Sequence, residues 1–149
     1  MKELKIRWQR LVSGGETCPR CSETEEELQK AVCSLEESLS PLGFKVVFKK
    51  QEISDVEFEE APSQSNMIMF NDKPLENWID GKIGESQCCD VCGYNECRTI
   101  IIGEETYEEI PAELIIKAGL IAASSMIGSG ESESCCNYKP SGTSNSSCC

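Results

Sequence analysis

The sequence has 149 residues, and none of them is histidine. Without histidine the chain cannot form the Cys-His or Ser-His-Asp arrangements that activate many nucleophiles. Basic residues are also scarce: 14 lysines and arginines stand against 26 aspartates and glutamates, which gives a net charge of −12. Because such a surface repels phosphate backbones and anionic lipids, we expect neither nucleic acids nor membranes as partners.

The sequence also shows no hydrophobic segment typical of export or membrane insertion. Residues 1–8 contain no apolar core of the kind that signal peptides carry. The most apolar stretch, residues 112–127, is interrupted by Lys117 and is too short to span a bilayer. We therefore expect a cytoplasmic protein, in which thiols stay reduced and cysteines more often do chemistry than form structural disulfides.

Cysteine, in contrast, is abundant, with 11 residues, and this odd number argues against a closed disulfide framework. Thiolates favour soft ions such as zinc, Cu(I), iron–sulfur clusters or As(III). Ten of the cysteines fall into a Cys-x-x-Cys pair, a second cluster and two adjacent pairs: Cys18 and Cys21; Cys88, Cys89, Cys92 and Cys97; Cys135 with Cys136, and Cys148 with Cys149. These groups are the candidate functional residues.

Hydrophobic patterning predicts an α/β domain over residues 1–128. The expected strands are 4–12, 44–48, 67–70 and 99–102, with 106–107 as a hairpin partner of the last. The strand 44–48 is apolar enough to be buried on both faces. A helix is expected from Ser22, with capping-box spacing to Glu25, and a last helix opens at Pro111. A helix between the first two strands implies a right-handed parallel crossover.

The remaining segments show no clear period. Residues 51–64 are acidic and irregular, and residues 81–97 hold four cysteines without helical or strand periodicity. Residues 129–149 are rich in Ser, Gly and Asn and contain almost no core-forming residues, so we expect a flexible tail that carries cysteines.

The last helix is predicted to bury one apolar face that includes Ile115, Ala118 and Ile121.

A strand, a Cys-x-x-Cys motif, a helix, three strands and a final helix follow one another along the chain. This order resembles the thioredoxin and glutaredoxin superfamily over roughly residues 4–127, and the chain is also similar to Cys-rich, glutaredoxin-like prokaryotic proteins. The resemblance implies a thioredoxin-like mixed sheet flanked by helices, in which Cys18 is the nucleophile and Cys21 resolves the mixed disulfide. That superfamily usually has a cis-proline before its third strand, where Ser65 or Asn66 stands here.

Physical chemistry supports the same roles for the two cysteines. A thiol at a helix N-terminus is stabilised as a thiolate by the helix dipole and by the free backbone N–H groups. Two intervening residues allow the two sulfurs to meet across the first helical turn. Arg20, which lies between the cysteines, is expected to favour the thiolate as well. A structural pair that supplies two of four zinc ligands is the alternative reading of Cys18 and Cys21.

A narrower resemblance concerns the other cysteines. Arsenical metallochaperones bind As(III) through a Cys-Cys pair and a nearby cysteine, and carry Cys-Cys pairs in a short C-terminal tail. The segment Cys88-Cys89-x-x-Cys92 is similar to their binding segment, and the closing Cys148-Cys149 is similar to their tail. The resemblance implies capture of a soft metal or metalloid. Paired C-terminal cysteines also occur in mercury-handling enzymes.

Several functions remain open at this point. The leading one is thiol–disulfide exchange with a redox partner protein. The rival is a binding protein or chaperone for As(III), zinc or mercury that passes its cargo to an acceptor protein. A zinc-stabilised interaction module is the third. The second cluster is compatible with structural zinc, an iron–sulfur cluster, As(III), a redox relay or unliganded thiols. No cofactor beyond a thiophilic metal or metalloid is implied.

Overall fold

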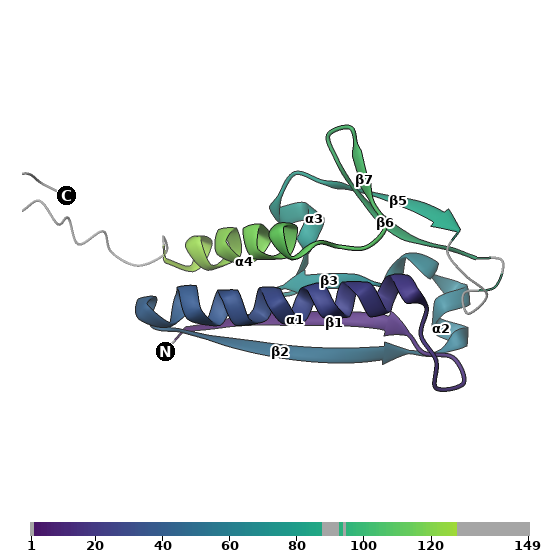
Figure 1. The fold of residues 1–149 in the computed structure, drawn as a ribbon, viewed down its shortest axis with the longest axis horizontal. Helices are drawn as coiled ribbons and strands as arrows, with labels where there is room; N and C mark the ends of the chain where they lie inside the picture. The colour runs from purple at the N-terminus through teal and green to yellow at the C-terminus, as the bar shows by residue number, and fades with distance from the viewer. Residues whose placement is uncertain (1, 88–92, 94, 128–149) are drawn as a thin grey trace, which may run out of the picture.

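Four strands form a mixed sheet in the computed structural model, which describes residues 2–87, 93 and 95–127 (Figure 1). The first half of the chain contains β1 (Lys2–Leu11), α1 (Pro19–Leu39), β2 (Phe44–Ile53), α2 (Asp55–Glu60), β3 (Met67–Phe70) and β4 (Lys73–Pro74). The second half contains α3 (Leu75–Trp78), β5 (Lys82–Gln87), β6 (Glu96–Ile102), β7 (Glu105–Tyr107) and α4 (Ala112–Ile127).

The sheet order is β2-β1-β3-β4. Strands β1 and β2 run parallel and are joined by α1, whereas β3 pairs antiparallel with β1 and β4 pairs antiparallel with β3. This arrangement confirms the predicted α/β fold class, a mixed sheet with flanking helices. A second sheet, in the order β5-β6-β7, is inserted between α3 and α4. The predicted tail, 129–149, lies outside the described residues.

The core lies between the mixed sheet and the two long helices (Figure 1). Alternate residues of β1, such as Leu4, Ile6 and Trp8, are buried because a strand points successive side chains to opposite faces. Along α1, Leu28 and Leu35 stand on the buried stripe because they recur at helical spacing. Helix α4 packs against α1, β1 and β3. Within the described part of the chain, no helix combines the length and the apolar character needed to cross a membrane.

Several predicted details are wrong. Helix α1 begins at Pro19 rather than at Ser22, because proline at the first helical position loses no needed hydrogen bond and presets the backbone. Strand β2 is not buried on both faces: it lies at a sheet edge, and Lys45 and Lys49 are exposed. On α4, Ile121 was predicted to be buried but is exposed, and the buried face includes Gly119.

Two segments predicted to be irregular contain regular structure. Residues 51–64 hold the end of β2 and the short helix α2, whose capping box joins Ser54 and Glu57. Residues 82–87 form β5, which pairs in register with β6 from Gln87↔Glu96 to Lys82↔Ile101. The hairpin of β5 and β6 is therefore the main element that the periodicity did not predict.

Candidate functional site

The Cys-x-x-Cys motif lies at the start of α1. Cys18 is the N-cap residue, with φ −75° and ψ 157°, and its carbonyl accepts a hydrogen bond of 3.1 Å from the backbone N–H of Ser22. Cys21 follows one turn later on the buried side of the helix. The two residues expose only 2% and 1% of their surface. The shifted helix start therefore puts Cys18, not Ser22, at the positive end of the helix dipole.

The two thiols differ in how readily they lose a proton. The pKa of Cys21 is raised far above its usual value, first by a hydrogen bond with Cys18, then by burial and by the negative charge of Cys18. Hydrogen bonds with Ser65 and Thr17 act in the opposite direction. Loss of the Cys21 proton is therefore strongly disfavoured while Cys18 carries a negative charge.

A buried polar network lies beside the thiol pair. The Oγ of Ser65 lies 3.9 Å from the Sγ of Cys21 and accepts a hydrogen bond of 3.1 Å from the backbone N–H of Leu11. Asn66 has a left-handed backbone with φ 57°. Its Oδ1 accepts from Trp8 Nε1 at 3.0 Å, and its Nδ2 donates to Thr24 Oγ1 at 3.1 Å. The described residues contain no cis peptide bond, and Ser65 and Asn66 directly precede β3.

Arg20 makes long-range contacts that the sequence does not predict. Its guanidinium donates to the carbonyls of Ser86, Gln87 and Cys97 at 3.4, 3.4 and 3.5 Å, and to the Ser86 Oγ at 2.9 Å. It also pairs with Glu108 at 3.4 Å. Arg20 is not among the causes that shift the pKa of Cys21. Its contacts instead hold the β5–β6 hairpin against the N-terminal end of α1.

A second buried arginine holds the same hairpin from the other side. Arg98 on β6 forms a buried ion pair with Glu76 on α3 and donates to the carbonyl of Ser63 at 2.8 Å. Ser63 is two residues before Ser65, the neighbour of Cys21. Sequence reasoning missed this pair, although a charged residue inside the apolar run of β6 is a sign of a buried ionic partner.

The second cysteine cluster is only partly described. Cys97 is buried on β6 opposite Ser86. The other predicted metal ligands lie outside the described residues: Cys88, Cys89, Cys92, Cys135, Cys136, Cys148 and Cys149. Within 2–87, 93 and 95–127, no three His, Cys, Asp or Glu side chains gather as a metal ion requires. The described cysteines, Cys97 included, therefore do not form a metal site among themselves.

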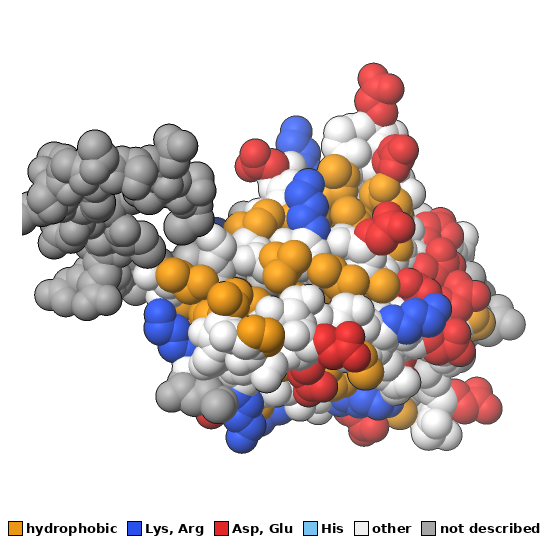
Figure 2. Space-filling view, turned by 60° about the vertical axis from the view of Figure 1, so that its left-hand side comes forward, with side chains coloured by type: hydrophobic (Ala, Val, Ile, Leu, Met, Phe, Trp, Pro, Cys, Tyr) orange, Lys and Arg blue, Asp and Glu red, His pale blue; other side chains and the backbone are white. Residues whose placement is uncertain are grey.

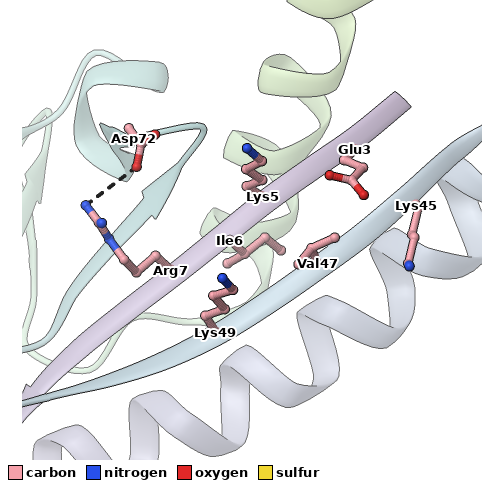
Figure 3. A pocket seen from close by; sticks show the side chains of 8 residues that line it. All are labelled: Glu3, Lys5, Ile6, Arg7, Lys45, Val47, Lys49 and Asp72. Atoms are coloured by element: carbon pink, nitrogen blue, oxygen red, sulfur yellow. Dashed lines mark ion pairs between the residues drawn. The ribbon is translucent and has the colours of Figure 1, made fainter. Parts of the chain in front are cut away.

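Two hollows on the surface have opposite character. Acidic side chains gather at the end of the molecule away from the C-terminal end of α4 (Figure 2). One hollow, of about 450 Å³, is lined by acidic residues that include Glu23 and Glu109, and the contact with Glu109 raises the pKa of Glu23. The other, of about 400 Å³, lies on β1 and β2 and is lined by lysines and the Arg7–Asp72 ion pair (Figure 3). Neither hollow is lined by a thiol.

Comparisons with known proteins give a family but no activity. A family model described as "Domain of unknown function (DUF2703)" matches residues 4–119. An "Uncharacterized protein" of Archaeoglobus fulgidus is 47% identical over 113 residues, which covers 76% of this chain and 82% of that protein. No solved structure gives a significant match. The residues that the family model matches include the thiol pair, Ser65 with Asn66, and both strands of the β5–β6 hairpin.

Proposed function

Because the chain belongs to the DUF2703 family, whose function is unknown, its chemistry must be inferred from its own residues, and we propose that it is a thiol–disulfide exchange protein. The observation that carries the proposal is the asymmetry of the thiol pair. Cys18 caps the positive end of α1, and Cys21 donates its hydrogen bond to Cys18 from one turn away. This arrangement makes one thiol reactive and keeps the second in reserve.

The exchange follows from that asymmetry. The Cys18 thiolate attacks one sulfur of a disulfide, forms a mixed disulfide and releases the other sulfur as a thiolate. Cys21 then loses its proton and attacks the Cys18 sulfur, which releases the second thiolate. The chain gains a Cys18–Cys21 disulfide while the substrate disulfide becomes two thiols, which take up the protons that the cysteines lose. The proposal includes a reducing, cytoplasmic setting.

A direct test follows the disulfide itself. The fully reduced protein is treated with a limiting amount of hydroxyethyl disulfide, quenched with N-ethylmaleimide and digested for mass spectrometry. We expect the peptide with Cys18 and Cys21 to lose two hydrogens first. Cys18→Ser should abolish this product, and Cys21→Ser should stop the reaction at the mixed disulfide. Cys33→Ser, which changes an exposed cysteine of the same helix, is the matched control. Oxidation that begins at other cysteines would contradict the proposal.

The second candidate is binding of a soft metal or metalloid. One observation favours it: Arg20 binds the carbonyls of Gln87 and Cys97, and these two residues flank the sequence that holds Cys88, Cys89 and Cys92. The chain thus enters and leaves its Cys-rich segment at the guanidinium of Arg20, the residue just before Cys21. Thiolates from that segment and from the four cysteines beyond residue 134 would be the ligands for zinc, As(III) or mercury.

Anaerobic native mass spectrometry of the protein as purified separates the two candidates. A bound zinc, iron–sulfur or arsenic mass that disappears when Cys88 and Cys89 are replaced by serine would favour metal binding. A protein without metal, which forms the Cys18–Cys21 disulfide on mild oxidation, would favour exchange. If the bound metal were zinc with a structural role, a chelator would unfold the protein, because metal-binding free energy is then folding free energy.

A further inference from the structure

The thiol pair is buried although exchange requires a sulfur that a substrate can reach. Cys18 exposes 2% of its surface and Cys21 exposes 1%. Exchange proceeds by attack on a sulfur through a mixed disulfide, so the incoming sulfur must touch the Sγ of Cys18. A disulfide on the broad surface of a folded protein needs a wide opening to reach a sulfur that is almost fully buried, whereas a small disulfide needs only a narrow one. The burial of the pair therefore bears on the class of substrate.

The β5–β6 hairpin is held against this end of α1 by a buried clamp. The Arg20 side chain is only 4% exposed, and its guanidinium spreads over four acceptor atoms of Ser86, Gln87 and Cys97. Glu108, just after β7, pairs with the guanidinium and also accepts from the Ser86 Oγ at 3.2 Å. The planar fork of an arginine can serve several acceptors at once, which the single ammonium of a lysine cannot do.

The clamp is joined covalently to the reactive pair. Arg20 lies one residue before Cys21 and two after Cys18, so the side chain that binds the hairpin belongs to the motif itself. The Arg98 contact with Ser63 ties the other strand of the hairpin to the short segment that leads to Ser65. Ser65 is itself the polar neighbour of Cys21. Arg20 thus joins the hairpin to the motif itself, and Arg98 joins it to the segment that precedes Ser65.

We propose that Arg20 is a positioning residue whose clamp on the β5–β6 hairpin restricts the Cys18–Cys21 pair to low-molecular-weight disulfides. This inference rests on the proposed exchange function and adds the substrate class. The reaction is the one given above: the small disulfide is reduced to two thiols, and Cys18 and Cys21 are oxidised to a disulfide. Loosening the clamp admits larger substrates without changing either reacting sulfur.

The test compares two disulfides in single-turnover experiments with the full chain. The reduced protein is mixed with hydroxyethyl disulfide or with folded insulin, and the Cys18–Cys21 disulfide is measured in the digested peptide over time. For Arg20→Ala we expect the rate with insulin to rise at least about tenfold, because loss of several buried hydrogen bonds shifts an opening equilibrium by at least that factor. The rate with hydroxyethyl disulfide should change much less.

Further variants separate the clamp from a general loss of structure. Ser86→Ala removes the shortest contact of Arg20 while keeping the strand, and should raise the insulin rate in the same direction but less. Arg20→Lys should fall between the wild type and Arg20→Ala. Lys82→Ala, at the other end of β5, is the control and should change neither rate. These variants keep the proposal testable if Arg20→Ala fails to fold.

The outcomes are distinguishable. Equal insulin rates in the wild type, Arg20→Ala and Ser86→Ala would overturn the clamp while leaving the exchange function intact. An equal rise of the oxidation rate with both substrates would also overturn the clamp, because the clamp would then not select by size. If neither disulfide oxidises the Cys18–Cys21 pair in any variant, the exchange function itself fails, and the clamp proposal fails with it.

Discussion

At the scale of single residues, the hydrogen bond between the two sulfurs sets apart their roles in the proposed exchange. Cys21 donates to Cys18, and this hydrogen bond is the largest cause of the raised pKa of Cys21. The same bond stabilises the Cys18 thiolate, since a hydrogen bond to the charged form favours that form. In the proposed exchange, the reactivity of Cys18 therefore depends on a neighbour that keeps its own proton at neutral pH.

Removing that neighbour gives the first prediction. In Cys21→Ala the Cys18 thiolate loses a hydrogen-bond donor, so the midpoint of its labelling should move to higher pH. The measurement is the pH dependence of iodoacetamide labelling at Cys18, read by mass spectrometry of the peptide. The exposed Cys33 on the same helix serves as the internal reference. An unchanged midpoint for Cys18 would show that the hydrogen bond does not set its pKa.

The raised pKa of Cys21 also predicts how stability depends on pH. Below about pH 8.5, Cys21 is protonated in both the folded and the unfolded chain, and its contribution to stability is fully present. As pH rises further, the unfolded chain loses this proton and the folded chain keeps it, so stability falls. Under reducing conditions, urea unfolding should show a steeper loss above about pH 8.5 for the wild type than for Cys21→Ser. Parallel curves would contradict the buried, protonated thiol.

Asn66 combines a left-handed backbone with two buried hydrogen bonds, and two substitutions separate these contributions. Asn66→Gly keeps the backbone at φ 57° without strain but leaves the indole N–H of Trp8 unsatisfied, which should cost about 2 kcal/mol. Asn66→Ala should cost about 1 kcal/mol more, because a Cβ is disfavoured there. Urea unfolding of both variants measures the difference. Equal losses would mean that strain at Asn66 is negligible.

At the scale of elements, the sequence predicts those that alternate or repeat with a clear period. Strands β1 and β3 and the buried stripe of α1 follow directly from such patterns. Strand β5 does not, because its Ile83 is exposed and its Gly84 packs against Thr99 of β6, so only pairing with β6 defines it. For the same reason the role of Arg20 could not be predicted: the acceptors of its guanidinium lie 66 to 77 residues away.

The start of α1 shows how two correct local rules can compete. Ser22 and Glu25 have capping-box spacing, yet the helix begins three residues earlier because Pro19 suits the first helical position. The candidate pair Cys18 and Cys21 could be chosen from the motif alone. The buried surroundings of the pair could not be predicted from the motif, since Ser65 and the hairpin come from distant parts of the chain.

The contact between the two long helices gives a prediction at this scale. A Cβ at Gly119 on α4 would lie 2.7 and 2.9 Å from the two methyl carbons of Leu35 on α1, and 3.2 Å from the Phe70 ring. Gly119→Ala should therefore destabilise the protein by about 1–3 kcal/mol of overpacking, reduced by the helix propensity of alanine of about 1 kcal/mol. Ser124→Ala, exposed on the same helix, is the control. Stabilisation by Gly119→Ala in thermal unfolding would contradict this close packing.

At the scale of the whole molecule, the two candidate functions depend on different parts of the chain. The hydrophobic core is made of residues between Leu4 and Met126, and the thiol pair, its polar neighbours and the clamp all lie within it or against it. The four cysteines beyond residue 134 belong to a stretch that the exchange chemistry does not use. Exchange is therefore a property of residues 2–127, whereas capture of a soft ion draws on the last 21 residues as well.

Removal of residues 129–149 is consequently the most informative change to the whole chain. If the protein is an exchange protein, the shortened chain should oxidise at Cys18–Cys21 with hydroxyethyl disulfide at the rate of the full chain, because the helix start and the clamp are unchanged. Its melting temperature should also stay the same, since every core residue that the structure describes is kept. A replacement of only the four tail cysteines by serine is the matched control for length. Arsenite affinity is measured by calorimetry under anaerobic conditions. If either change lowers this affinity while exchange is slow in the full chain, the tail thiols carry the function. The metal-binding candidate then takes the place of exchange.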